Sequence, residues 1–160
     1  QEELMGIPSF DTPDYSELFT EEKEMLGKLK KAFLMVAGGA VQKYGPDLEG
    51  HQQLLIAAAD ILIEIYMAES TILRTEKLAK KEGEAKVQEQ IAMAKLYLYK
   101  AVDVVTQKGK ESVISFAEGD EQRMMLMGLR RFTKYTNMPN IIGLRELITT
   151  KLVTENEYCF

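Results

Sequence analysis

The chain has 160 residues, of which 46% are hydrophobic and 28% are charged, a composition typical of one soluble globular domain with a real core. Its net charge of -5 argues against nucleic acid as the main partner, and its one cysteine, Cys159, excludes an internal disulfide and a cysteine-based zinc site. One cysteine also fits a reducing, cytoplasmic compartment.

The first 16 residues have the composition of a linker or arm. Pro8 and Pro13 lie there among small and polar residues, and the opening "QEELMGIPSF" has acids where a signal peptide needs lysines. The chain begins with Gln1 instead of methionine, so we expect a fragment of a larger protein. We therefore predict a linker over 1–16 and a helical bundle domain over 17–160.

Helical spacing of apolar residues begins after this linker, and strand signals are nearly absent. A first helix is predicted to begin near Ser16 or Thr20, with Thr20 as its cap, and to end at Gly45 and Pro46. The glycine pair Gly38 and Gly39 lies inside this helix, where it favours close helix packing or a kink. The apolar stripe of this helix comprises Leu26, Leu29, Phe33, Val36 and Ala40.

Two long helices follow. The second is predicted from about Asp47 or Gly50 to Glu82 and the third from about Glu84 to Lys108, with Gly83 as the turn. Gly109 is predicted to break or bend the third helix. The apolar stripe of the second helix comprises Leu54, Ala58, Ile61, Ile65, Ala68 and Ile72, and that of the third comprises Val87, Ile91, Ala94, Leu98, Ala101 and Val105.

Two shorter helices complete the pattern. Asp120 is predicted to cap a fourth helix, and Pro139 is predicted to lie in the first turn of a fifth helix that ends near Leu152. Helices joined by short turns indicate an all-α fold. We predict an up-and-down bundle of four to five helices with a long central antiparallel pair.

Three carboxylates interrupt the apolar second helix. At about 100° per residue, Asp60 and Glu64 lie about 40° apart on one side, and Glu69 lies on the opposite side. They cannot converge on one ligand from this helix alone, so we expect acids paired with lysines or arginines. Asp60 and Glu64 also interrupt the best candidate for a membrane-spanning segment.

Three apolar side chains, Ile56, Ile63 and Met67, share the side of the helix that carries Asp60 and Glu64. A helix that is apolar nearly all round is central or covered by something else. We therefore predict an interdomain face made of Ile56, Asp60, Ile63, Glu64 and Met67.

Signals for chemistry are weak. The only histidine, His51, has Leu48 three residues before it instead of an acid, so the Glu-x-x-His signature of a di-iron bundle fails. No nucleophile with a histidine partner is present, and we expect no catalytic, cofactor-binding or metal-binding residue in this chain. A basic group on the fourth helix is expected to be a solvated face; it comprises Arg123, Arg130, Arg131 and Lys134.

Several strings resemble the C-terminal helical extension of bacterial very-long-chain-type acyl-CoA dehydrogenases. They are "AAADILIEIYMAESTILRTEKL", "GDEQRMMLMGLRRFTKY" and "LRELITTKLVTENEYCF", after a linker-like "MGIPSFDTPDY". The resemblance implies a parent flavoprotein that uses FAD in fatty acid β-oxidation and passes electrons to electron-transfer flavoprotein. It places the flavin and the catalytic residue in preceding domains, on which this bundle packs, and it implies a homodimer.

Two alternatives stay open beside this non-catalytic domain. The first is a free-standing helical module for protein–protein interaction, which would expose the interdomain face as an open groove. The second is a bundle enzyme, which would need two acids from different helices to converge in a dry pocket. In mitochondrial members of the family the helical hairpin is linked to membranes, but here "ILRTEKLAKKEGEAK" interleaves acids with lysines, which argues against membrane association.

Overall fold

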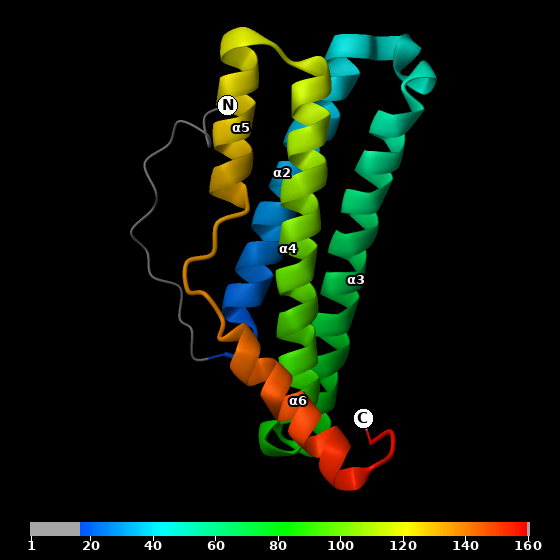
Figure 1. Ribbon diagram of the computed structural model, residues 1–160. Coiled ribbons are helices and arrows are strands. Elements are labelled where there is room, and N and C mark those ends of the chain that lie inside the picture. The colour runs from blue at the N-terminus through cyan, green and yellow to red at the C-terminus, as the bar shows by residue number, and fades with distance from the viewer. Residues whose placement is uncertain (1–16, 160) are drawn as a thin grey trace.

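The computed structural model describes residues 17–159, and the predicted linker, 1–16, lies outside them. The described part is all-α, with five α-helices and two short 3-10 turns, as the sequence predicts (Figure 1). The elements in chain order are α2 (Thr20–Tyr44), η1 (Gly45–Gly50), α3 (Gln52–Glu82), η2 (Glu84–Lys86), α4 (Gln88–Phe116), α5 (Gly119–Phe132) and α6 (Ile141–Glu155).

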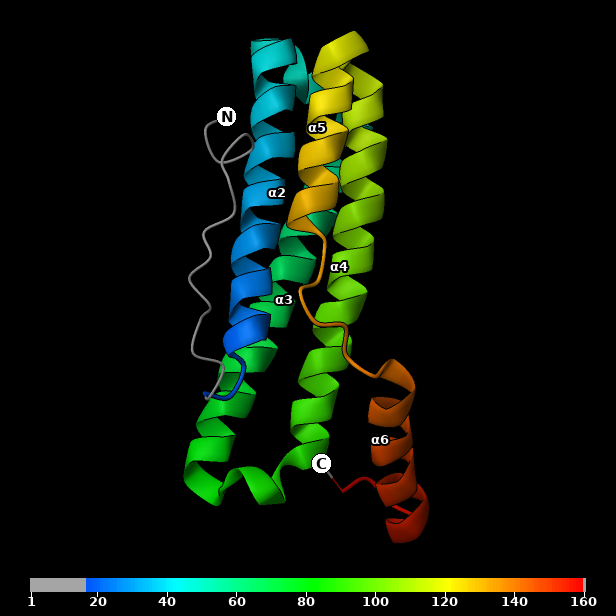
Figure 2. The same ribbon diagram turned by 90° about the vertical axis from the view of Figure 1, so that its left-hand side faces the viewer.

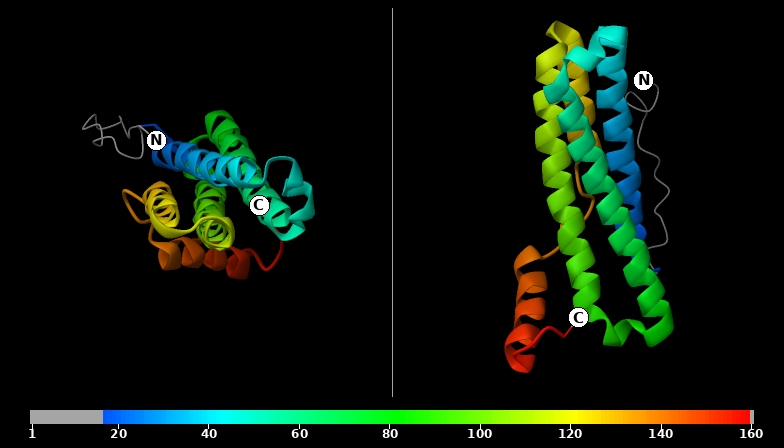
Figure 3. Two further views of the ribbon diagram at one scale, coloured as in Figure 1. Left: turned by 90° about the horizontal axis from the view of Figure 1, so that it is seen from above. Right: turned by 90° about the vertical axis from the view of Figure 1, so that its right-hand side faces the viewer.

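Helix α4 lies at the centre of the bundle and contacts the four other helices. Its most extensive contact is with α3, which runs antiparallel to it and confirms the predicted long pair (Figure 1). Seen from above, α2 and α3 lie on one side of α4, while α6 lies on the other (Figure 3). Figure 2 shows α5 beside the upper half of α4 and α6 beside its lower half.

The core follows the predicted apolar stripes. A large cluster joins α2, α3 and α4, and its fully buried side chains include Leu29, Ile61, Ile72, Leu98 and Val105. A smaller cluster closes the upper end, where Val36 and Phe116 meet residues of α5. No helix among residues 17–159 is long and apolar enough to cross a bilayer.

The start of α2 differs from the prediction. The cap residue is Phe19, not Thr20, and Phe19 has a left-handed backbone with φ 66°. Its side chain is buried in the main core, and this burial offsets the cost of the unusual backbone. The predicted end holds, since α2 stops at Tyr44 and Gly45 takes a positive φ.

The connections at both ends of α3 are 3-10 turns. Residues Gly45–Gly50 form η1, so α3 begins at Gln52, slightly later than the predicted Asp47 or Gly50. At the other end Gly83 makes the predicted turn with φ 90°, where only glycine is unstrained. The turn η2 then delays the start of α4 to Gln88.

Gly109 does not break α4, so the predicted break was wrong: the helix continues to Phe116. Gly109 is buried and lets Leu129 of α5 approach the backbone. Gly39 of α2 has the same role against Met125 and Phe116, which confirms close packing there. A β-carbon at Gly38 would meet no atom of the described residues within 4 Å.

The caps of the last two helices also differ from the prediction. Helix α5 has Glu118 as its cap residue, and Asp120 lies in the first turn, where it pairs with Arg123 at 3.2 Å. Pro139 precedes the cap of α6 instead of lying in its first turn. The cap is Asn140, whose Oδ1 accepts a hydrogen bond from the backbone N–H of Gly143 at 3.1 Å.

Candidate interdomain face

The three acids of α3 are ion-paired, as predicted. Asp60 lies 3.4 Å from Nζ of Lys108 and Glu64 lies 3.1 Å from Nζ of Lys100, both on α4. Glu69 lies on the other side, 2.6 Å from Nζ of Lys30 on α2. The acids therefore join α3 to its two neighbours and do not converge on one site.

The Glu64 pair belongs to a small cluster with Tyr97. The ammonium group of Lys100 lies 5.4 Å from the centre of the Tyr97 ring, a cation–π contact. Burial, and second the neighbouring Glu64 carboxylate, raise the pKa of the Tyr97 hydroxyl above its ordinary value. The cluster fixes the edge of the predicted face against α4.

The apolar members of the predicted face are open to solvent. Ile56 is 53% exposed, Ile63 is 57% exposed and Met67 is 44% exposed. Asp60 and Glu64, on the same side of α3, form the border toward α4 because they are held by the lysines of that helix. The arrangement leaves an apolar surface with a charged rim.

This apolar surface is wider than the predicted interdomain face. On α3 four exposed residues were not predicted to belong to it: Leu55, Leu62, Tyr66 and Leu73. They recur at spacings of seven, four and seven, which place them on one stripe of the helix, and this spacing could have predicted them. We call the whole set the α2–α3 surface; its members, each 40–67% exposed, are Leu34, Val41, Leu55, Ile56, Leu62, Ile63, Tyr66, Met67 and Leu73.

Two ion pairs explain why α2 contributes to this surface. Lys23 lies 2.8 Å from Glu76 and Lys30 lies 2.6 Å from Glu69, so the antiparallel alignment of α2 and α3 is fixed. Leu34 and Val41 continue the stripe that begins with these lysines, at further spacings of four and seven. They therefore lie beside the N-terminal half of α3.

A surface of this kind is suited to binding. Apolar patches rimmed by charge mark contacts with other protein surfaces. Within residues 17–159, no three His, Cys, Asp or Glu side chains are grouped so that they could hold a metal ion. His51 directly precedes the first turn of α3, where its ring stacks on Tyr44 with centroids 3.7 Å apart.

The basic group on α5 is exposed, as expected for a solvated face. Arg123 pairs with Asp120 across one helical turn, and Arg130 and Lys134 lie on the exposed side of the chain. Arg131 is also exposed and has an interaction of its own.

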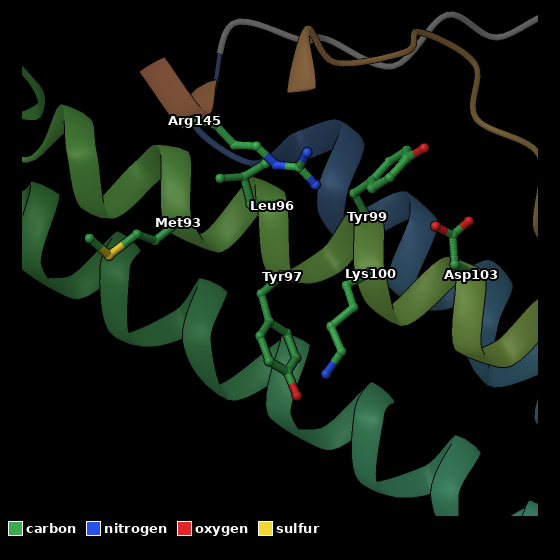
Figure 4. Close-up of a pocket in the computed structure, with 7 residues that line it drawn as sticks. All are labelled: Met93, Leu96, Tyr97, Tyr99, Lys100, Asp103 and Arg145. Carbon is green, nitrogen blue, oxygen red and sulfur yellow. The ribbon is translucent and has the colours of Figure 1, made fainter. Parts of the chain in front are cut away.

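An open trough of about 440 Å³ lies between α4 and α6 (Figure 4). Met93, Leu96 and Tyr99 line it with apolar atoms, and Arg145 of α6 reaches across it toward Tyr99. Asp103 lies on the other side of Tyr99, one helical turn along α4. Tyr97 and Lys100 line the side nearer to α3.

Helix α6 covers only part of this trough. None of its residues is fully buried, and its contact within the described chain is essentially with α4. Ile141, Leu144 and Ile148 are half-buried, and Lys151 pairs with Glu89 of α4 at 3.3 Å. On the outer side of α6, Ile142, Leu147 and Val153 are exposed.

Comparisons with known proteins agree on one family. The family described as "Acyl-CoA dehydrogenase, C-terminal domain" matches residues 28–131. A probable acyl-CoA dehydrogenase of Bacillus subtilis (strain 168) is 37% identical over 136 residues, which is 85% of this chain and 23% of that protein.

A solved structure supports the same assignment. The crystal structure of an acyl-CoA dehydrogenase complexed with FAD from Bacillus anthracis superposes with a TM-score of 0.87 at 34% identity. The match covers 100% of this chain and 26% of that one. The chain therefore spans about a quarter of the length of these relatives.

Proposed function

The chain belongs to the acyl-CoA dehydrogenase C-terminal domain family, and we propose that it is the non-catalytic C-terminal bundle of a cytoplasmic, FAD-dependent enzyme of fatty acid β-oxidation. The finer features of this proposal are the very-long-chain subtype, a homodimeric parent and electron-transfer flavoprotein as the electron acceptor. They rest on the resemblance of the helical strings to that subfamily. The share of the relatives that this chain spans supports a role as one part of a larger enzyme.

The observation that carries the proposal is the α2–α3 surface. Nine large apolar side chains face solvent there, next to the ion pairs that fix α3. Burying them against another surface is favourable by about 25 cal/mol per Å² of apolar area. The preceding dehydrogenase domains of the same chain are the occupant we propose for this surface.

The α4–α6 trough does not fit FAD. A flavin site has to enclose an extended ring system and hold two phosphates, whereas the α4–α6 trough is open. Of its two cations, Lys100 is already paired with Glu64. The flavin would therefore be held by the preceding domains, and this bundle would act through packing and assembly.

The test compares two isoleucines of similar exposure in the complete enzyme. Ile63 lies on the α2–α3 surface and Ile114, 51% exposed, lies on α4 outside it. Ile63→Asp should lower the thermal stability of the enzyme and speed hydrogen exchange along α3, because a carboxylate would be buried at the contact. Ile114→Asp should change neither.

Measurements on the isolated 160-residue chain distinguish the proposed interdomain contact from the alternative of a free-standing interaction module. Without its parent domains, the Ile63→Asp chain should be as stable as the unmodified chain and less prone to associate. Equal effects of the two substitutions in the complete enzyme would overturn the proposed contact. A flavin absorption band in the purified 160-residue chain would contradict the non-catalytic role.

A further inference from the structure

Gly38 lies at a position in α2 that no packing contact among the described residues explains. Gly38 and Gly39 stand together inside this helix, where glycine is less favourable than any residue except proline. Gly39 is explained by its neighbours, since a β-carbon there would lie 2.7 Å from Cε of Met125 and 3.0 Å from the ring of Phe116. A β-carbon at Gly38 would meet nothing within 4 Å among the described residues.

The side of α2 that carries Gly38 belongs to the α2–α3 surface. Leu34 stands four residues before it and Val41 three residues after it, the two spacings that make residues neighbours on a helix. Leu34 is 67% exposed, Val41 is 54% exposed, and Gly38 itself is exposed. The main chain of α2 is therefore bare at one point within this apolar surface.

Gly27 shows that the apolar neighbours, and not the glycine alone, distinguish position 38. A β-carbon at Gly27 would also meet nothing within 4 Å among the described residues. At the same spacings, however, Gly27 has Lys23 and Lys30, whose ammonium groups pair with Glu76 and Glu69. Because charged side chains at a surface stay hydrated, Gly27 belongs to a solvated part of α2.

A bare main chain within an apolar surface permits a close contact. A glycine lets another segment approach the backbone to a distance that any side chain would prevent. Close approach also increases the apolar area that Leu34 and Val41 can bury on the two sides of the contact. The packing gained in this way offsets the cost of a glycine inside the helix.

We propose that the preceding dehydrogenase domains approach α2 most closely at Gly38, with an apolar segment packed against its main chain between Leu34 and Val41. The inference rests on the proposed function, from which it takes the occupant of the α2–α3 surface. The relatives support that occupant, because the larger part of each of them lies outside the region that this chain matches. Position 38 would thus set how closely the bundle docks.

The experiment adds a side chain at position 38 in two settings. In the isolated 160-residue chain, Gly38→Ala and Gly38→Leu should raise the melting temperature, because both residues favour a helix more than glycine does. In the complete enzyme, the added side chain should hold the docking segment away from α2. Gly38→Leu should then lower the melting temperature and make hydrogen exchange in α2 roughly tenfold faster, and Gly38→Ala should have a smaller effect.

Gly27→Leu is the matched control, since it adds the same side chain to the same helix among charged neighbours. It should raise the melting temperature in both settings. The same result from Gly38→Leu in the complete enzyme would overturn the proposal, and so would a loss in the isolated chain, which would place the clash inside the bundle. A loss in the complete enzyme that disappears on dilution to monomers would assign the contact to a second copy and overturn the proposal as well.

The two proposals fail separately. If Ile63→Asp destabilises the complete enzyme and Gly38→Leu does not, the preceding domains cover α3 but do not approach α2 at Gly38. If Ile63→Asp and Ile114→Asp have equal effects in the complete enzyme, the proposed contact at the α2–α3 surface is itself wrong.

Discussion

Gly109 of α4 lies directly against Leu129 of α5. A β-carbon at position 109 would lie 2.9 Å from Cδ1 and 3.2 Å from Cδ2 of Leu129, closer than carbon atoms pack. Leu129 is itself buried in the main core, so it has little room to move. The absence of a side chain at Gly109 sets how closely α5 approaches α4.

This contact predicts the effect of adding a side chain at position 109. Gly109→Val should destabilise the chain by about 2 kcal/mol, because overpacking of a core costs about 1–3 kcal/mol. Gly38→Val is the matched control, since a β-carbon there meets nothing within 4 Å of the described residues. Urea unfolding should show no loss for the control, and equal losses would contradict the packing argument.

The buried hydroxyl of Tyr135 predicts that folding stability falls at alkaline pH. Its hydroxyl oxygen is buried without a hydrogen-bond partner, and burial, then Glu22 and Asp103, raise the pKa of Tyr135 well above 10. Above pH 10 the unfolded chain loses a proton that the folded chain keeps, so stability falls as pH rises.

Tyr135→Phe should therefore make the decline of stability above pH 10 shallower. At pH 7 it should be neutral or stabilising by up to about 1 kcal/mol, because an unpaired hydroxyl is removed from the interior. Chemical unfolding at several pH values would measure both effects. The exposed Tyr66→Phe should change neither, and a steeper decline for Tyr135→Phe would refute the prediction.

The ion pairs of Glu76 predict that folding stability falls as the pH is lowered, whereas the buried Tyr135 predicts a fall as the pH is raised. Its hydrogen bonds to Lys23 and then Lys80 lower the pKa of Glu76 below the ordinary 4.5. The stabilisation is therefore present above pH 4.5 and is lost as pH falls through the lower folded-state pKa.

Glu76→Gln should cost less than about 1 kcal/mol at pH 7, because solvent screens the pair, and a smaller amount at pH 3. The difference should shrink in 1 M salt. Unfolding at both pH values and both salt concentrations would test this. A cost independent of pH would show that packing, and not charge, is the source.

The cap hydrogen bond of Asn140 predicts that α6 opens locally when this bond is removed. Asn140→Ala removes the cap bond to Gly143 and should cost about 1 kcal/mol. Because no α6 residue is fully buried, the loss should appear as hydrogen exchange several-fold faster in α6 and unchanged in α4. Asn140→Asp keeps the acceptor and should exchange like the unmodified chain; uniform acceleration would contradict a local role.

The sequence predicted those features that depend on the angle around one helix. The spacing of Ile61, Ile65 and Ile72 gave the buried side of α3, and the angles of Asp60 and Glu69 placed them toward different neighbours. Periodicity alone determines these directions.

Features that depend on two helices could not be predicted in this way. A glycine such as Gly109 can end a helix or admit a neighbour, and only the position of Leu129 decides between them. Leu34 joins the α2–α3 surface through the alignment of α2 with α3, which the Lys30–Glu69 pair fixes. Asn140 became a cap because the chain turns after Pro139.

The ion pairs of α3 also restrict how the bundle can assemble while it folds. Its buried side is rich in alanine and isoleucine, so sliding α3 by one turn would still bury apolar atoms. After such a slide Asp60 would oppose Lys100, and Lys108 would face Ile56 instead of an acid. Each pair contributes little stability by itself, but together they make the slid alignments unfavourable and leave one for the chain to adopt.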